Sequence, residues 1–136
     1  MSIKLEPIGW VRRKEATPTS PEELASGRAR IEVAPRFREG LTGVSPGDAL
    51  LVLFWMDRAE RGTLLVHPRG DLSRPLRGVF ATRSPHRPNP IGATTVRVIR
   101  VDQERGILEV EGLDALDGTP VLDLKATDPH FDSGVS

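Results

Sequence analysis

The stretch that decides the fold is TTVRVIRVDQERGILEVE, residues 94–111. On both sides of the polar segment 102–106, apolar and polar residues alternate near period two, as they do in half-exposed strands. A short polar segment between two such runs is typical of a hairpin turn. The pattern therefore predicts two strands joined by a tight connection.

Short runs rich in Val, Ile and Leu recur along the rest of the chain, with Gly and Pro between them. The run 50–55 is apolar throughout, so we expect it to be the most deeply buried strand. The clearest helical signal begins at Ser20, where Pro21 and Glu23 complete a capping box. Regular strands without long helices between them predict a mainly β protein, a single small closed or nearly closed β-barrel with one or two short helices. The expected strands cover residues 3–11, 28–33, 49–55, 63–66, 78–82, 94–101, 107–111 and 120–124.

Length and composition narrow the class of protein. The 136 residues suffice for one domain, and we expect the barrel in residues 1–126 and a surface or disordered tail in residues 127–136. The chain has no cysteine, which excludes disulfides and thiolate nucleophiles. It also lacks an apolar stretch near the ~20 residues of a membrane span, so we expect a cytoplasmic protein with no membrane partner.

The charges are divided unevenly along the chain. Residues 1–101 hold 17 Lys and Arg against 10 acids, whereas residues 102–136 hold 2 against 9. Between Arg58 and Arg100 there are nine arginines and only two acids, which is the balance that an anion-binding face needs. The alternative is that the acidic segment folds against this region and neutralises it.

Two polar loops stand out as candidate binding segments. In GVFATRSPHRPNPIG, residues 78–92, three prolines push Ser84, Arg87 and Asn89 towards extended backbone and exclude a helix. A rigid loop rich in donors is typical of a binding site, although it also occurs as a plain surface connection. In GLDALDGTPVLD, residues 112–123, three carboxylates lie among apolar residues. Two such loops in a short chain would be able to share one pocket.

These two motifs, with the opening Pro7-Ile8-Gly9, resemble the TsaA-like (YaeB, TrmO) family of β-barrel tRNA methyltransferases that use S-adenosylmethionine. The resemblance covers roughly residues 3–125. The best-understood members methylate threonylcarbamoyl-adenosine in tRNA. The resemblance therefore implies S-adenosylmethionine as cofactor, tRNA as substrate, a homodimer and no metal ion.

The same resemblance implies where the cofactor binds. The residue following Pro-Ile-Gly is Ala93, and the arginine of Phe-Ala-Thr-Arg is Arg83. An alternative role for Arg83 is to pair with a carboxylate of the second loop and tie the two loops together. Asp123 has a similar alternative, because it can simply accept hydrogen bonds from nearby backbone amides. The implied cofactor contacts are Asp57, Arg58, Arg83, Ala93, Asp114, Ala115, Leu116, Asp117 and Gly118.

The acceptor nitrogen of threonylcarbamoyl-adenosine is conjugated with a carbonyl, so a base within hydrogen-bond reach is expected. His86 is the one histidine in the signature loop and is the candidate for acid-base chemistry or substrate contact, the alternative being a surface hydrogen bond. Asn89 is the second catalytic candidate, and it holds either the target base or the loop's own backbone. Phosphate contacts are expected from the arginines of the basic segment, Arg69, Arg74, Arg77 and Arg87.

The chain departs from the family pattern in two places. Residues 12–18, RRKEATP, stand where family members carry a Pro-Arg-Gln element, and the usual Lys-Pro-Tyr reads Lys125-Ala126-Thr127. The resemblance therefore does not determine which molecule accepts the methyl group. The alternatives are a methyltransferase of the same fold that acts on another acceptor, and a barrel that binds a nucleoside or RNA without catalysis.

Overall fold

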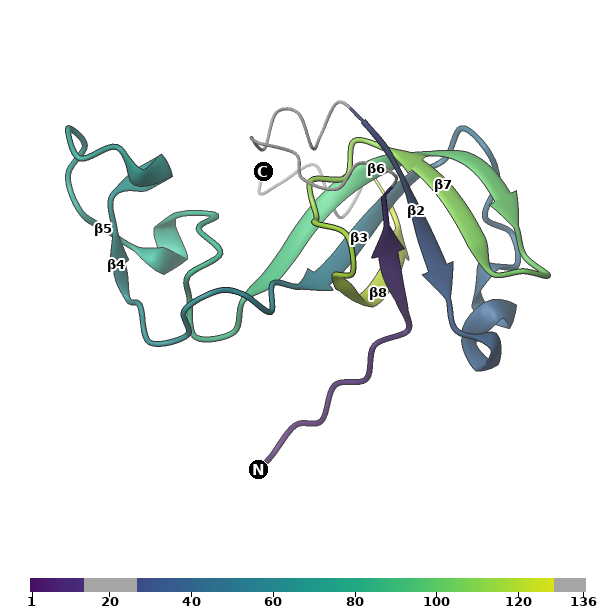
Figure 1. Ribbon diagram of the computed structural model, residues 1–136, viewed down its shortest axis with the longest axis horizontal. Helices are drawn as coiled ribbons and strands as arrows, with labels where there is room; N and C mark the ends of the chain where they lie inside the picture. The colour runs from purple at the N-terminus through teal and green to yellow at the C-terminus, as the bar shows by residue number, and fades with distance from the viewer. Residues whose placement is uncertain (14–26, 129–136) are drawn as a thin grey trace.

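The main body of the protein is a closed barrel of six antiparallel strands in the order β1-β2-β7-β6-β3-β8 (Figure 1). It is seen in a computed structural model that describes residues 1–13 and 27–128. The architecture confirms the prediction of a mainly β closed barrel. The helix expected from Ser20 and most of the tail, residues 129–136, lie outside the described residues. The barrel strands are Gly9–Arg12 (β1), Arg28–Val33 (β2), Ala49–Trp55 (β3), Ile91–Asp102 (β6), Ile107–Glu111 (β7) and Pro120–Ala126 (β8).

The core fills the barrel with alternate residues of each strand. In β3 the side chains of Leu50, Val52 and Phe54 are buried, whereas Leu51 and Leu53 are only half-buried. None of the residues 50–55, predicted to form the most deeply buried strand, is exposed, and their burial alternates because every barrel strand has one face inside and one outside. Further fully buried residues are Val11, Ile31, Val98, Leu108, Val110, Leu113 and Val121.

The hairpin predicted over residues 94–111 is formed by β6 and β7, with Asp102 paired to Ile107 at the turn. Strand β6 pairs with β3 along residues 91–97 and with β7 along residues 97–102. A register shift between Val98 and Arg100 marks a bulge, the usual device by which a long strand bends around a barrel. The first residues of β6 therefore lie at one end of the barrel, beside the end of β3.

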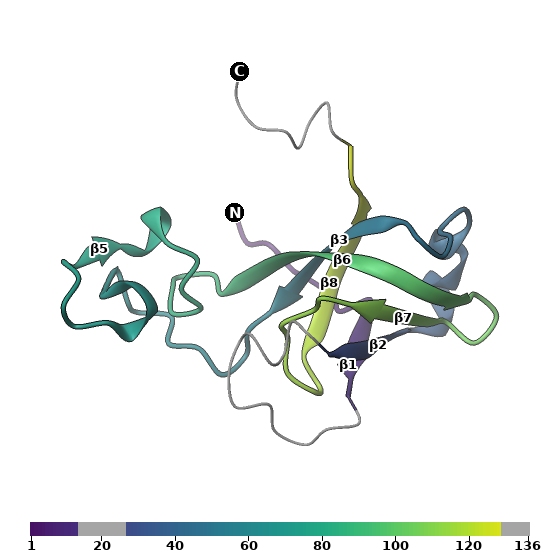
Figure 2. The same cartoon turned by 90° about the horizontal axis from the view of Figure 1, so that it is seen from above.

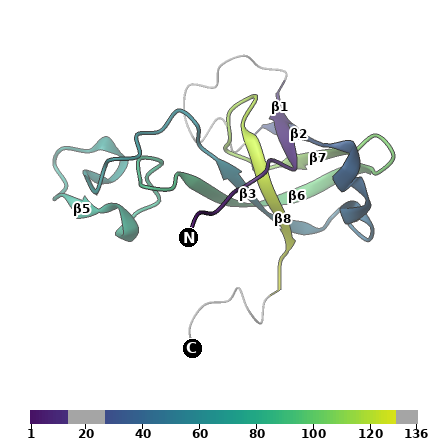
Figure 3. The ribbon, with the colours of Figure 1, turned by 90° about the horizontal axis from the view of Figure 1, so that it is seen from below.

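Between β3 and β6 the chain leaves the barrel as a separate extension, residues 57–90, which we call the arm. All three ribbon views place it to one side of the barrel (Figures 2 and 3). Its only sheet joins Leu65–Val66 (β4) to Arg77–Gly78 (β5). Short 3-10 turns lie at Pro68–Gly70 (η2) and Val79–Ala81 (η3). The strand expected over residues 78–82 was therefore mostly wrong, since only Gly78 is in a strand and η3 follows it at once.

The other end of the barrel is partly covered by a longer 3-10 helix, Pro35–Leu41 (η1), between β2 and β3. Its Leu41 is buried and its Phe37 packs against the core. Proline opens the helix, where its missing N–H costs no hydrogen bond. The two ends of the barrel are thus built differently, one by η1 and the other by the junction with the arm.

Candidate functional site

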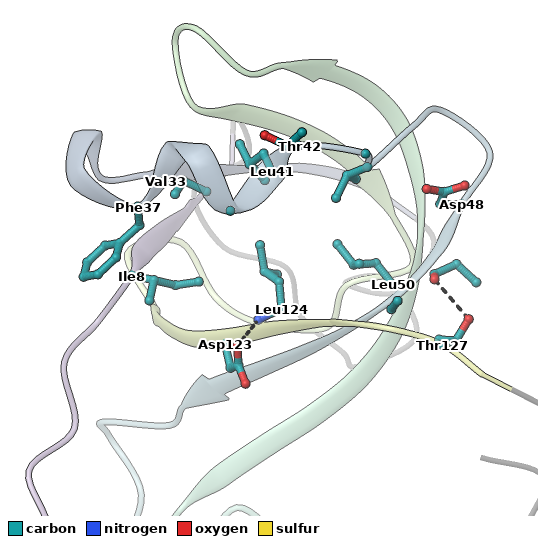
Figure 4. Close-up of a pocket in the computed structure, with 15 residues that line it drawn as sticks. Ile8, Val33, Phe37, Leu41, Thr42, Asp48, Leu50, Asp123, Leu124 and Thr127 are labelled. Carbon is teal, nitrogen blue, oxygen red and sulfur yellow. Dashed lines mark hydrogen bonds between the residues drawn. The ribbon is translucent and has the colours of Figure 1, made fainter. Parts of the chain in front are cut away.

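The barrel has a cavity at each end of β3. The larger, of about 700 Å³, lies beside η1 and reaches Leu50 (Figure 4). The smaller, of about 400 Å³, lies where the arm joins the barrel and reaches Phe54. Four residues of extended strand separate Leu50 from Phe54, roughly 13 Å. The two cavities are therefore distinct candidate sites.

The larger cavity offers few polar groups to a ligand. Asp123 accepts a hydrogen bond from its neighbour's backbone N–H, on Leu124, at 2.9 Å and pairs with Lys125 Nζ at 3.1 Å (Figure 4). Asp48 accepts from the backbone N–H of Ser45 at 2.9 Å. Both carboxylates are thus already engaged, and apolar side chains make up much of the remaining wall. For Asp123, this geometry matches the alternative of a local hydrogen-bonding role.

The smaller cavity brings the two polar loops together. Arg83, from the arm, donates from Nη2 to the carbonyl of Ala93 at 2.5 Å. Thr94, the next residue along β6, donates from Oγ1 to Asp114 Oδ1 at 2.6 Å. The two loops therefore meet on consecutive residues of one strand. No ion pair joins Arg83 to Asp114 or Asp117, so the loops are not tied by the direct pairing considered above.

A close contact inside the barrel shapes the floor of this cavity. Gly92 lies directly against the buried ring of Phe54, and a Cβ atom on residue 92 would stand 2.3 Å from Phe54 Cε2. Both residues line the cavity, together with Met56 and Ile91. Glycine at position 92 therefore lets the strand pass beside the aromatic ring.

The wall of the smaller cavity combines apolar side chains with side chains of positive and of negative charge. Asp114 supplies a carboxylate, and Arg83 and Arg87 supply guanidinium groups. The Nε of Arg87 is buried and has no hydrogen-bond partner among the described residues. An unsatisfied buried donor is costly, so an acceptor atom of a bound molecule would stabilise it. A ligand with apolar, cationic and anionic parts suits these walls.

Comparison with known families identifies the chain. The family model of the tRNA-methyltransferase O N-terminal domain matches residues 9–133. The chain belongs to this family. A crystal structure of TrmO from Pseudomonas aeruginosa superimposes with a TM-score of 0.72 at 34% sequence identity and covers 100% of this chain and 60% of its own.

Two archaeal relatives of this TrmO-family chain carry names that refer to S-adenosyl-L-methionine binding. A probable S-adenosyl-L-methionine-binding protein from Archaeoglobus fulgidus is 43% identical over 98% of this chain, and the match covers 36% of that protein. One from Methanothermobacter thermautotrophicus is 38% identical over 98% of this chain and 96% of its own length. The chain thus spans about a third of the first relative and nearly all of the second.

The remaining predicted cofactor contacts of this TrmO-family chain lie around the cavity rather than in its wall. Asp57 and Arg58 follow the lining residue Met56 and are exposed at the base of the arm. In the turn after Asp114, Ala115 is buried and Leu116 is exposed. Gly118 has φ +82°, a left-handed conformation that glycine adopts without strain.

The two catalytic candidates are held by hydrogen bonds within the arm. His86 Nδ1 accepts from the backbone N–H of Glu60 at 3.0 Å. The neutral ring then carries its proton on Nε2, which suits donation and not proton abstraction. Asn89 Oδ1 accepts from Arg61 Nη2 at 3.1 Å. Neither residue lines the cavity, so both contribute to the shape of the loop in this arrangement.

The four arginines predicted to contact tRNA fall into two groups in this TrmO-family fold. Arg69, Arg74 and Arg77 are exposed on the outer part of the arm. Arg87 lines the cavity, and its Nη2 donates to the carbonyls of Thr82, at 2.9 Å, and Val79. Arg87 therefore stabilises the signature loop, whereas the other three face solvent.

Three residues at the site were missed by the sequence reasoning. Thr94 donates a hydrogen bond to Asp114. Arg61 donates to Asn89 Oδ1 and to the carbonyl of Pro88. Arg13 donates to the carbonyl of Ala115, in the turn after β7. Arg61 also stacks over Trp55, with its Cζ 5.2 Å from the ring centroid. Their partners are 20 to 104 residues away in the sequence, so only the fold reveals these contacts.

No helix in the described residues is both long and apolar enough to cross a membrane. No group of three or more His, Cys, Asp or Glu side chains in residues 1–13 and 27–128 is arranged to hold a metal ion.

Proposed function

We propose that this protein is an S-adenosylmethionine-dependent methyltransferase that N-methylates threonylcarbamoyl-adenosine next to the anticodon of tRNA. Membership of the tRNA-methyltransferase O family and the names of the archaeal relatives support the reaction and the cofactor. The observation that carries the proposal is the cavity at the junction of arm and barrel, where Arg83, Ala93 and Asp114 come together. We expect the methylation of tRNA to take place in the cytoplasm.

The residues of this cavity fit the cofactor by their chemistry. Its volume of about 400 Å³ is within the usual range for small-molecule sites. Asp114 suits a sulfonium cation, because only its Oδ1 is engaged by Thr94 among the described residues. Arg83 and the buried Nε of Arg87 suit the carboxylate of the amino-acid end. Phe54, Met56 and Ile91 offer apolar surface to the base.

When bound, S-adenosylmethionine supplies an electrophilic methyl group. The protein's part is to bind and orient, an effect worth up to about 7–11 kcal/mol when the reacting atoms are held ~3–3.5 Å apart. Arg83 and Asp114 fix the two ends of the site on consecutive residues of β6. His86, with Nδ1 engaged by Glu60, would donate from Nε2 to a carbonyl of the acceptor.

The arm supplies the surface for RNA. Its outer arginines, Arg69, Arg74 and Arg77, are exposed and would contact phosphates of the bound RNA. Asp71 lies among them, and its pKa is lowered by hydrogen bonds from Ser73, so it stays ionised and pairs with Arg74 at 3.6 Å. Arg74 is therefore partly neutralised.

A direct test uses purified protein, tRNA from cells that lack the gene, and S-adenosylmethionine with a deuterated methyl group. Mass spectrometry of the digested tRNA should find the label on threonylcarbamoyl-adenosine. Arg83→Ala should abolish most of the labelling, and Arg100→Ala, whose partner Glu109 lies on the β7 side at 3.4 Å, should retain it. Label on another nucleoside would favour a different acceptor.

The non-catalytic alternative is tested by thermal unfolding with the cofactor. A ligand at one hundred times its Kd stabilises the folded state by about 2.7 kcal/mol, which raises Tm by roughly 5–15 °C in a domain of this size. The wild type should show this rise with millimolar S-adenosylmethionine. The absence of a rise, together with retained binding of an anticodon stem-loop, would favour a barrel that binds RNA without catalysis.

We also propose that two copies associate through the arm. Leu64, Leu65, Leu72, Leu76 and Phe80 are between 55% and 83% exposed there, although a two-stranded sheet needs further packing for stability. A second copy would cover this apolar surface. Sedimentation should give a dimer for the wild type and a monomer for Phe80→Glu, with Leu116→Glu on the barrel as the matched control. A wild-type monomer at micromolar concentration would refute the association.

A further inference from the structure

The segment that carries Asp114 has little regular structure of its own. Residues 112–118 connect β7 to β8 without helix or strand. At the end of the segment, the N–H of Thr119 donates to the carbonyl of Leu116 at 3.2 Å. The N–H of Gly118 donates to the carbonyl of Val11, on β1, at 2.8 Å. The position of Asp114 therefore depends on groups supplied by other parts of the chain.

Arg13, the residue after β1, supplies three of these contacts. Its backbone N–H donates to Asp117 Oδ1 at 2.8 Å, and its Nε donates to the carbonyl of Ala115 at 2.8 Å. Its Nη2 donates to the carbonyl of Leu113. One residue thus binds alternate positions of the segment, 113, 115 and 117.

The alternation decides which way the segment faces. The side chains of Leu113 and Ala115 are buried in the barrel, whereas Asp114 between them is exposed and meets Thr94 at the cavity. Arg13 holds the carbonyls on both sides of Asp114. The planar guanidinium can reach two carbonyls at once, which a lysine ammonium cannot do with the same geometry.

We infer that Arg13 is a positioning residue of the cofactor site, acting through residues 113–117 to hold Asp114 opposite Arg83. This inference rests on the proposed function. Arg13 does not line the cavity, so it does not touch the cofactor. In metal sites, groups that orient a ligand change affinity by about ten- to a hundredfold when they are removed, and we expect an effect of the same order here.

The experiment compares Arg13→Ala and Arg13→Lys with Arg12→Ala as the matched control. Arg12 is the preceding residue, and its guanidinium meets Glu32 at 3.5 Å on the exposed side of the barrel. Calorimetric titration with S-adenosylmethionine, well below every Tm, gives Kd. Hydrogen exchange of the amides in residues 112–118 gives the order of the segment without any ligand.

We expect Arg12→Ala to bind like the wild type, and both Arg13 variants to bind about ten- to a hundredfold more weakly. The variants should also exchange faster at residues 112–118, with the amides of β3 unchanged. Wild-type affinity in Arg13→Ala would overturn the inference. If the alanine variant does not fold, wild-type affinity in Arg13→Lys overturns it instead.

Failure of the proposed function gives a different result. A wild type that does not bind S-adenosylmethionine would refute the cofactor site, and with it the role of Arg13 in cofactor binding. Hydrogen exchange would then still decide whether Arg13 orders residues 112–118. Unchanged exchange in both Arg13 variants would refute that part as well.

Discussion

Replacing Gly92 by alanine tests whether the cavity depends on the close approach of β6 to Phe54. The added Cβ would stand 2.3 Å from Cε2, 2.4 Å from Cζ and 2.9 Å from Cδ2 of the Phe54 ring. Carbon atoms in contact need about 3.5–4.0 Å, so the ring must move by more than 1 Å. Phe54 is only 5% exposed, and its neighbours in the core limit that movement.

The expected cost follows from overpacking a filled core, about 1–3 kcal/mol. In a domain of this size each kcal/mol lowers Tm by about 3–6 °C, so the Tm of Gly92→Ala should fall by roughly 3–18 °C in calorimetry. Gly62→Ala is the matched control, because an added Cβ at residue 62 meets no atom within 4 Å. That control should keep the wild-type Tm or gain slightly.

The contact can be isolated by a double-mutant cycle. Phe54→Leu removes the ring atoms that face residue 92, so combining it with Gly92→Ala should cost less than the sum of the two single changes. A coupling energy of about 0.5–3 kcal/mol is expected for residues in contact. If Gly92→Ala shifts Tm by less than about 1 °C, or if the two changes simply add, the reasoning about this contact is wrong.

Two further predictions concern the arm. Ser73→Ala should raise the pKa of Asp71 towards its ordinary value in an NMR titration, because the Ser73 side chain is the largest cause of the lowered pKa. A lowered pKa contributes stability that is present above the ordinary pKa and is lost as pH falls through the lowered pKa, so Ser73→Ala should lower stability slightly at neutral pH and leave it unchanged in strong acid. Arg77→Ala should reduce the slope of log K against log salt for an anticodon stem-loop by about 0.7–0.9. An unchanged slope, with Arg100→Ala as control, would remove Arg77 from the RNA surface.

The barrel was predictable because local patterns determine it. Strands at residues 28–33, 49–55 and 107–111 were expected with the bounds that the structure shows. The alternation of apolar and polar residues also predicted the hairpin of β6 and β7. The arm was not predictable in the same way, because Leu64, Leu65 and Phe80 look like core residues in a sequence and are exposed in the chain. Apolar composition indicates burial but does not say against which partner.

The candidate site was predictable in its loops and not in its contacts. The motifs at residues 78–92 and 112–123 indicated that two polar segments would share a pocket, and Arg83 and Asp114 line the same cavity. Which group each side chain bonds depends on how distant strands pair. Arg83 bonds a carbonyl of β6 rather than a carboxylate, and this choice is set by the pairing of β6 with β3.

The larger of the two cavities lies at the other end of the barrel from the proposed site. The larger cavity beside η1 has nearly twice the volume of the smaller one, yet its lining residues include two carboxylates and no Arg or Lys. A ligand with a cationic centre and a carboxylate gains most where opposite charges are in place and still have unused donors and acceptors. Asp114, Arg83 and the buried Nε of Arg87 meet that condition at the junction with the arm. In the proposed function the arm would have two roles. The loop that carries Arg83 and Arg87 completes the cavity, and the same extension carries the outer arginines that would bind RNA.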